Sequence, residues 1–262
     1  MQEVIQVRCP VKNNLLSGAS YFAEGVKLIW HPKLRAYILV PLLVNICLFV
    51  VLTGTLVHFT GGAIETVMAE LPSWLAPLAW LAWIIIGVLL LIVYGYSFNM
   101  ITNILAAPFY GFLAQKAEEI ITGQPLPAES LWKMIPRVMG RELSKLIYFL
   151  TRGIIITLVI LLLATIPLVN FLAPIIGIAW GAWSMTIQYS DYPADNHQRG
   201  FKILRKKLWT KAFSSFGFGG MVMGCSIIPV VNIFAMPAAV VGGTLFWLNE
   251  LKKCEPEPVE HG

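Results

Sequence analysis

Charged side chains are scarce in this chain, at 13% of its residues, whereas soluble domains carry about 25%. Two long stretches, 153–190 and 212–249, contain no charged residue at all. Hydrophobic residues make up 57% of the sequence and the mean hydropathy is +0.73. This shortage of charge excludes an ordinary soluble domain and indicates an integral membrane protein.

Motifs for cross-linking, metal binding and catalysis are also missing. The four cysteines are far apart and form no CxxC pair, and the four histidines have no ligand-like spacing. The sequence has no phosphate-binding GxxxxGK[ST], no HExxH and no GxSxG. We therefore expect no metal site, no cofactor and no catalytic residue, and we predict that the chain is not an enzyme.

The basic residues that are present fall into four groups. Five of the nineteen Lys and Arg residues precede position 36, six lie within 116–152, six within 199–211 and two at 252–253. The segment 56–72 has none. The positive-inside rule then places 56–72 outside the cell and every other polar segment, with both termini, in the cytoplasm. We assign the net charge of +5 to topology and anionic lipid, and expect no nucleic-acid partner.

The hydrophobic pattern predicts one all-α membrane domain over 1–262. Pro108 is expected to break the second long helix, and Asp195 to cap a basic surface helix. The expected elements are an interfacial amphipathic helix at 14–30, transmembrane helices at 33–57 and 74–107, cytoplasmic-face helices at 109–152, a hairpin at 153–190, the basic surface helix at 191–211, a second hairpin at 212–249 and a disordered tail at 250–262.

Each uncharged stretch is interrupted at its middle by proline and asparagine. Pro167 and Asn170 interrupt the first, and Pro229 and Asn232 the second. Proline breaks the helical hydrogen-bond ladder, and an asparagine at membrane depth needs a polar partner. Arms of about 14–16 residues reach about 21–24 Å, less than the roughly 30 Å of hydrocarbon. We favour half-penetrating hairpins over the alternative of short full crossings.

Similar asparagines recur in the two long helices, where Asn45 follows Pro41 and Asn103 precedes Pro108. One hypothesis is that Asn45, Asn103, Asn170 and Asn232 line a polar translocation pathway, as broken helices do in transporters. The alternative is that each amide caps a half-helix or bonds a neighbouring helix. Recurrence of the motif favours the pathway.

The segment His31-Pro32-Lys33-Leu34-Arg35 starts the first long helix with basic residues. Free backbone N–H groups and the positive dipole end make a helix start a ready anion site. Arg35 offers a planar fork and Lys33 a mobile charge. Basic residues also flank first spans merely to fix orientation, and spacing alone favours that alternative.

Four carboxylates lie near the predicted cytoplasmic face: Glu118, Glu119, Asp191 and Asp195. They can relay protons in an ion-coupled transporter, or pair with the surrounding lysines and arginines. Pairing is favoured.

In the order and spacing of its segments the chain resembles the CysZ sulfate-transporter family of bacterial inner membranes. The resemblance rests on the two Pro–Asn tips and on residues 25–29, 31–35, 41–45, 103–110 (NILAAPFY) and 192–195. It implies two long crossings, two half-penetrating hairpins, homo-oligomers built from dimers, and sulfate uptake that feeds cysteine biosynthesis. Some members are described as inverted relative to one another, whereas the charge distribution here favours one orientation.

The family's anion site, a Gly-Leu-Arg-Arg-like segment, carries over to Lys33, Leu34, Arg35 and Ala36. This chain departs from it, with Lys33 in place of glycine and Ala36 in place of the second arginine. The expected function is proton-coupled sulfate symport by a multi-pass inner-membrane protein, with sulfate and membrane lipids as partners. The alternatives are a passive anion channel and a non-transporting membrane scaffold or regulator.

Overall fold

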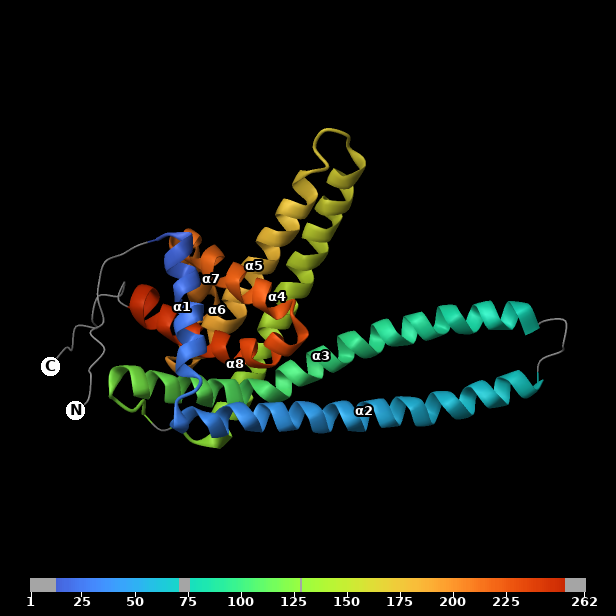
Figure 1. Cartoon of the computed structure of the whole chain (residues 1–262), viewed down its shortest axis with the longest axis horizontal. Coiled ribbons are helices and arrows are strands. Elements are labelled where there is room, and N and C mark those ends of the chain that lie inside the picture. Colours follow the sequence, from blue (N-terminus) through green and yellow to red (C-terminus); the bar gives the residue numbers. More distant parts are fainter. Residues whose placement is uncertain (1–12, 71–75, 128, 253–262) are drawn as a thin grey trace. The chain divides into compact units, whose positions relative to one another are not determined.

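The computed structural model describes residues 13–70, 76–127 and 129–252, and every regular element in these residues is a helix (Figure 1). The protein is an all-α membrane protein, as the sequence predicts. It divides into two compact units. The two-helix unit is Val40–Ala106, and the main unit is Met1–Leu39 with Ala107–Gly262.

The two-helix unit contains most of α2 (Arg35–Glu70) and the first part of α3 (Ala76–Thr122). The helices are joined by a hydrogen bond between Thr53 Oγ1 and Tyr94 OH at 2.7 Å and by Phe49 against Phe98, with ring centroids 5.9 Å apart. Most apolar side chains of this pair are exposed, as lipid-facing residues are. Its described apolar stretches are Ile46–Thr60 and Trp83–Phe98.

Two predicted boundaries of the long helices are wrong. Helix α2 continues to Glu70, beyond the end predicted at 57, so most of the segment 56–72 is helical, and its position outside the cell stays a prediction. Helix α3 runs through Pro108 without a break. Packing of the turns that follow, where Leu113, Ala114 and Ala117 are completely buried, offsets the backbone hydrogen bond that proline removes.

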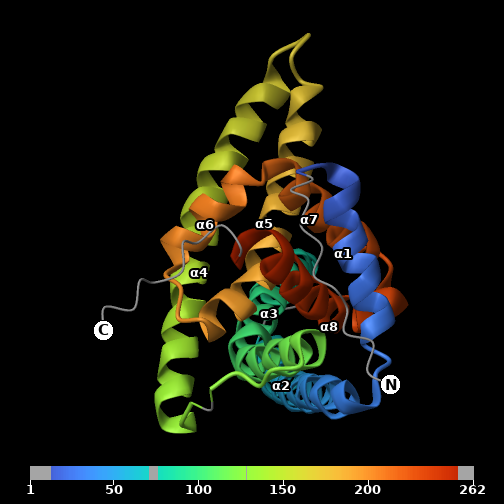
Figure 2. The same ribbon diagram turned by 90° about the vertical axis from the view of Figure 1, so that its left-hand side faces the viewer.

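Two hairpins form much of the main unit. Hairpin 1 joins the end of α4 (Leu131–Thr165) to α5 (Leu172–Asn196), and its tip projects beyond the neighbouring helices (Figure 2). Hairpin 2 joins α7 (Ala212–Ser226) to α8 (Pro229–Phe246), followed by a π-helical end, η3 (Trp247–Leu251).

The two hairpins differ in burial. The segment Trp132–Thr165 is long and apolar enough to cross a membrane, and none of its most apolar window is buried. Phe234–Leu251 passes the same test by length and composition, but 83% of its window is buried within the protein. Hairpin 1 therefore presents an apolar surface suited to lipid, whereas α8 is a core helix of the main unit. The depth to which either hairpin penetrates stays a prediction.

Helix α1 (Leu15–Leu28) packs against hairpin 2 through glycines. A Cβ at Gly18 would collide with the carbonyl of Ser214 on α7, and one at Gly25 with the carbonyl of Ala238 on α8. Only glycine permits this backbone approach. Helix α1 is thus fixed to the core along one face, while Leu16 on α1 and Trp30 just after it are exposed; the interfacial role of this helix stays a prediction.

The basic surface helix is shorter than predicted. Helix α6 spans Phe201–Thr210 and follows Gly200, which provides no side-chain cap. Asp191 and Asp195 lie within α5 instead, so the predicted cap at Asp195 is wrong. Of the tail expected at 250–262, Glu250 and Leu251 end the helix η3 and are buried, while 253–262 lie outside the described residues.

Candidate functional site

The predicted anion site lies in the main unit, at the start of the first long helix. A short 3₁₀ turn, η1 (Pro32–Leu34), precedes α2. The N–H of Lys33 donates to His31 Nδ1 at 3.3 Å, and the N–H of Leu34 to the His31 carbonyl at 2.9 Å. Both amides are therefore already used within the chain.

The side chains at this helix start have separate roles. Leu34 is 0% exposed and anchors the turn, whereas Lys33, Arg35 and Ala36 are exposed. An anion arriving from solvent would thus meet the charges of Lys33 and Arg35 before any backbone group of the 3₁₀ turn. This geometry fits an entrance that attracts anions better than a closed binding pocket.

A ring contact connects this helix start to hairpin 2. Trp30, three residues before Lys33, packs against Phe234 with ring centroids 5.9 Å apart. Asn232 lies two residues before Phe234, in the first turn of α8. Its N–H donates to the Ile228 carbonyl at 2.8 Å, but its side-chain Oδ1 is buried without a hydrogen-bond partner among the described residues. One predicted pathway amide thus lies in the same part of the unit as the predicted anion site.

The structure does not bring the exposed Asn170 to Asn232, and the remaining two pathway asparagines lie outside the side chains that it describes. Asn170 is exposed in the turn of hairpin 1. Asn45 and Asn103 belong to the two-helix unit, and their side chains lie outside the described ones. The pathway of four amides stays a prediction.

A ladder of ion pairs joins α4 to α5 and is the main polar feature that sequence reasoning did not assemble. Arg141 binds Asp191 through Nε and Nη2 at 2.7–3.1 Å, and Arg137 pairs with Asp195. Lys145, which is 1% exposed, lies 2.5 Å from Glu142 and 3.5 Å from Asp191. The sequence does carry a signal for this ladder. The cations Arg137, Arg141 and Lys145 of α4 are spaced four residues apart, as are the two aspartates of α5.

The two α5 aspartates are held by their partners on α4. Burial raises the pKa of the Asp195 carboxyl above its ordinary value, although the charge of Arg137 opposes the shift. Asp195 therefore takes up a proton at a higher pH than an ordinary aspartate does.

A second cluster surrounds Glu118 at the end of α3. Its carboxylate lies 2.9 Å from His197 Nε2 and 3.1 Å from Lys252 Nζ. Burial favours the neutral acid, but the hydrogen bond from His197 and the charges of His197 and Lys252 outweigh it and lower the pKa of Glu118. Glu119 pairs with Lys116 at 2.8 Å. The prediction that the four carboxylates pair with nearby cations is confirmed.

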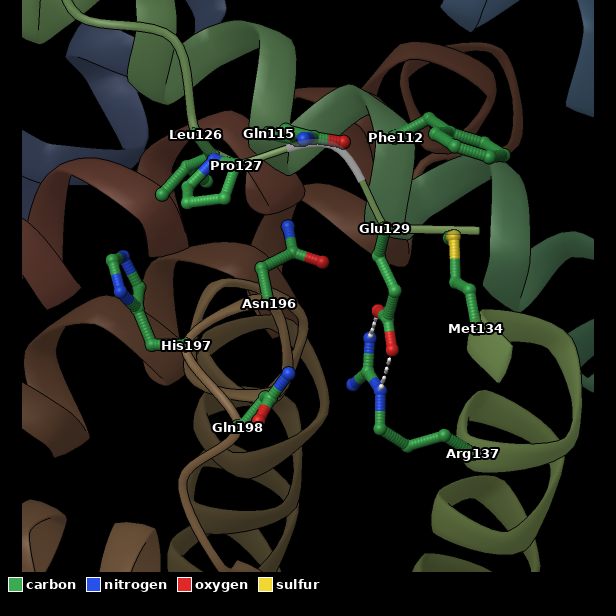
Figure 3. A pocket seen from close by; sticks show the side chains of 10 residues that line it. All are labelled: Phe112, Gln115, Leu126, Pro127, Glu129, Met134, Arg137, Asn196, His197 and Gln198. Carbon is green, nitrogen blue, oxygen red and sulfur yellow. Dashed lines mark hydrogen bonds and ion pairs between the residues drawn. The ribbon is translucent and has the colours of Figure 1, made fainter. Parts of the chain in front are cut away.

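A cavity of about 400 Å³ opens between the ends of α3 and α5 and the start of α4 (Figure 3). An ion pair between Glu129 and Arg137 forms one wall. Amide side chains from Gln115, Asn196 and Gln198 line other parts of it. Within the described residues, no group of three or more His, Cys, Asp or Glu side chains is placed to hold a metal ion.

The comparisons with known proteins agree with one another. Residues 21–237 match the family model described as sulfate transporter CysZ/Etoposide-induced protein 2.4. Proteins named sulfate transporter CysZ are similar along almost their whole length. One from Pseudomonas paraeruginosa is 42% identical, covering 90% of this chain and 96% of that protein. Another from Pseudomonas syringae pv. tomato is 40% identical, covering 94% of this chain and 97% of that protein.

Proposed function

The chain belongs to the sulfate transporter CysZ/Etoposide-induced protein 2.4 family, and from this premise we propose that it carries sulfate across the bacterial inner membrane. The observation that carries the proposal is the likeness to proteins named sulfate transporter CysZ over nine-tenths of the chain. The exposed Lys33 and Arg35 at the start of α2 supply charges that an oxyanion requires.

In this proposal, Lys33 and Arg35 collect sulfate and Asn232 receives it. The contact between Trp30 and Phe234 holds the helix start against α8, the helix that carries Asn232. An unpaired buried carbonyl oxygen costs about 1–3 kcal/mol, and a donor that arrives with the substrate would relieve this cost. Hydrated sulfate brings such a donor, because its water can bind Oδ1 while Nδ2 donates to the anion. Asn45, Asn103 and Asn170 would continue the route.

We propose further that uptake is coupled to protons and supplies sulfur for cysteine biosynthesis. Asp195 supports the coupling, because its pKa is raised and it lies in an ion-pair ladder that protonation would rearrange. The alternative is a passive channel. Collapse of an imposed pH gradient would slow uptake by a symporter and leave the flux through a channel unchanged.

The apolar surface of hairpin 1 supports two other parts of the proposal. Leu158, Leu161 and Leu162 are each about 60% exposed, which suits contact with lipid or with a second copy of the chain. We propose a multi-pass inner-membrane protein, with both termini in the cytoplasm, that assembles as a homo-oligomer built from dimers.

The helix-start site is tested by uptake of labelled sulfate into proteoliposomes. Arg35→Ala is compared with Arg152→Ala, which removes an exposed arginine from α4 rather than from the helix start. We expect Arg35→Ala to reduce uptake at low sulfate about tenfold and Arg152→Ala to leave it unchanged. Equal uptake by all three proteins would remove Arg35 from the mechanism. A protein that moves no anion but co-purifies with a partner would favour the scaffold.

A further inference from the structure

The fork of the Arg137 guanidinium is filled by a side chain from a neighbouring non-helical segment. Its Nη2 donates to Glu129 Oε2 at 2.7 Å and its Nε to Oε1 at 3.4 Å (Figure 3). The other edge serves Asp195, because Nη1 donates to the Asp195 carbonyl at 2.7 Å and pairs with its carboxylate. One guanidinium thus pairs with two carboxylates, those of Glu129 and Asp195.

The two carboxylates are held to different degrees. Asp195 is fixed in the last turns of α5 and its side chain is 10% exposed. Glu129 lies in the segment between α3 and α4, which leaves α3 at Gly123 with a φ of 73°, and its side chain is 28% exposed. Glu129 can leave Arg137 without unwinding a helix, and a partly exposed ion pair contributes little to stability.

The space beside Arg137 suits a small oxyanion. Two oxygens of a tetrahedral oxyanion bind a guanidinium fork as a carboxylate does. The adjoining cavity of about 400 Å³ presents the amide side chains of Gln115 and Gln198. Arg137 and Gln198 also line a second cavity of about 370 Å³, whose charged lining residues are Arg137, Arg141, Arg199 and Asp195. The three arginines outnumber the one carboxylate, which favours an anion at the shared wall.

We propose that Arg137 is a second oxyanion site of this protein, occupied in this structure by the carboxylate of Glu129 as an internal competitor. The site is separate from the start of α2. The choice of sulfate as the ligand rests on the proposed function. On the predicted topology the site faces the cytoplasm, where incoming sulfate is released. Sulfate bound there would displace Glu129 and free the segment between α3 and α4.

Binding of labelled sulfate to the purified chain in detergent tests this site without requiring transport. The variant is Glu129→Gln in an Arg35→Ala background, which weakens the helix-start site. We expect Glu129→Gln to tighten sulfate binding about two- to fivefold, because the competing ion pair is lost. Glu119→Gln is the matched control, since it removes the same charge from a pair with Lys116 that does not line the cavity.

A second substitution tests whether the fork itself holds the anion. In the Glu129→Gln protein, Arg137→Lys keeps a cation beside Asp195 but removes the planar fork, so the gain in binding should be lost. Three results would overturn the site. They are no tighter sulfate binding in Glu129→Gln, equally tighter binding in Glu119→Gln, and tighter binding that persists after Arg137→Lys. If the intact chain transports sulfate but Glu129→Gln does not bind sulfate more tightly, only the second site is refuted. If Glu129→Gln binds sulfate more tightly but the intact chain does not transport it, only the proposed function is refuted.

Discussion

Arg141 and Asp191 join α4 to α5 through three hydrogen bonds of 2.7–3.1 Å, with the Asp191 side chain 1% exposed. The same guanidinium donates to the Arg199 carbonyl at 2.7 Å, so it also fixes the segment that leads into α6. One arginine thus ties together the base of hairpin 1 and the start of the basic helix.

We predict that Arg141→Ala destabilises the folded protein by about 3 kcal/mol, because it leaves a buried carboxylate without its main partner. Thermal unfolding in detergent measures the effect. Arg152→Ala, which removes an exposed arginine from the same helix, should stay within about 0.5 kcal/mol of the intact chain. Equal melting temperatures for the two variants would contradict the assigned role of the pair.

Gly18→Ala should detach or shift α1, because the new methyl group meets the backbone carbonyl of Ser214 rather than a movable side chain. The expected cost is about 1–3 kcal/mol in the same unfolding measurement. Gly220→Ala on α7 is the control, since a Cβ there has open space and alanine favours the helix. A Gly18→Ala protein as stable as the Gly220→Ala protein would refute the close packing.

Glu118 should make stability depend on pH at the acid end. Its pKa is lowered in the folded state, so its contribution is present above the ordinary value of about 4.3 and is lost as pH falls through the lowered folded value. Glu118→Gln should therefore lower the melting temperature at pH 7, with a difference that narrows below pH of about 4. Glu119→Gln, in a more exposed pair, should have a much smaller effect. A difference in melting temperature between Glu118→Gln and the intact chain that does not change with pH would contradict this assignment.

Asn232→Ala should separate function from stability. The side-chain Oδ1 of Asn232 is buried without a partner among the described residues, so its removal should leave the melting temperature unchanged or raise it. Sulfate uptake should fall about tenfold if the amide contacts the anion on its route. Asn170→Ala, at the exposed turn of hairpin 1, tests whether sulfate uptake also falls when an exposed asparagine of the predicted pathway is removed. Normal uptake by Asn232→Ala would remove this residue from the pathway.

Much of the fold could be predicted because hydrophobic runs and breaking residues act locally. The scarcity of charge around Pro167 and Pro229 indicates two apolar hairpins, and each turn lies next to the expected proline. The break predicted at Pro108 is wrong, because the effect of a proline depends on packing further along the helix. Buried Leu113 and Ala114 sustain α3, and only the folded structure reveals these contacts.

The candidate site was less accessible to sequence reasoning. Lys33 and Arg35 were found from their position before a long helix, but His31 takes up two of the expected amides through a local cap. The pairing of Arg137 with both Glu129 and Asp195 requires three segments to meet. Spacing on one helix can suggest such a pairing, but only tertiary structure selects the partners.

The most direct test of sulfate transport from the start of α2 is the initial rate of labelled sulfate uptake into proteoliposomes at a low sulfate concentration. We expect the intact chain to exceed protein-free vesicles and Arg35→Ala to fall about tenfold below the intact chain. Ala36→Arg, which adds the second arginine that the family resemblance implies, should raise the rate. Uptake no faster than in protein-free vesicles, or equal in all three proteins, would contradict the account.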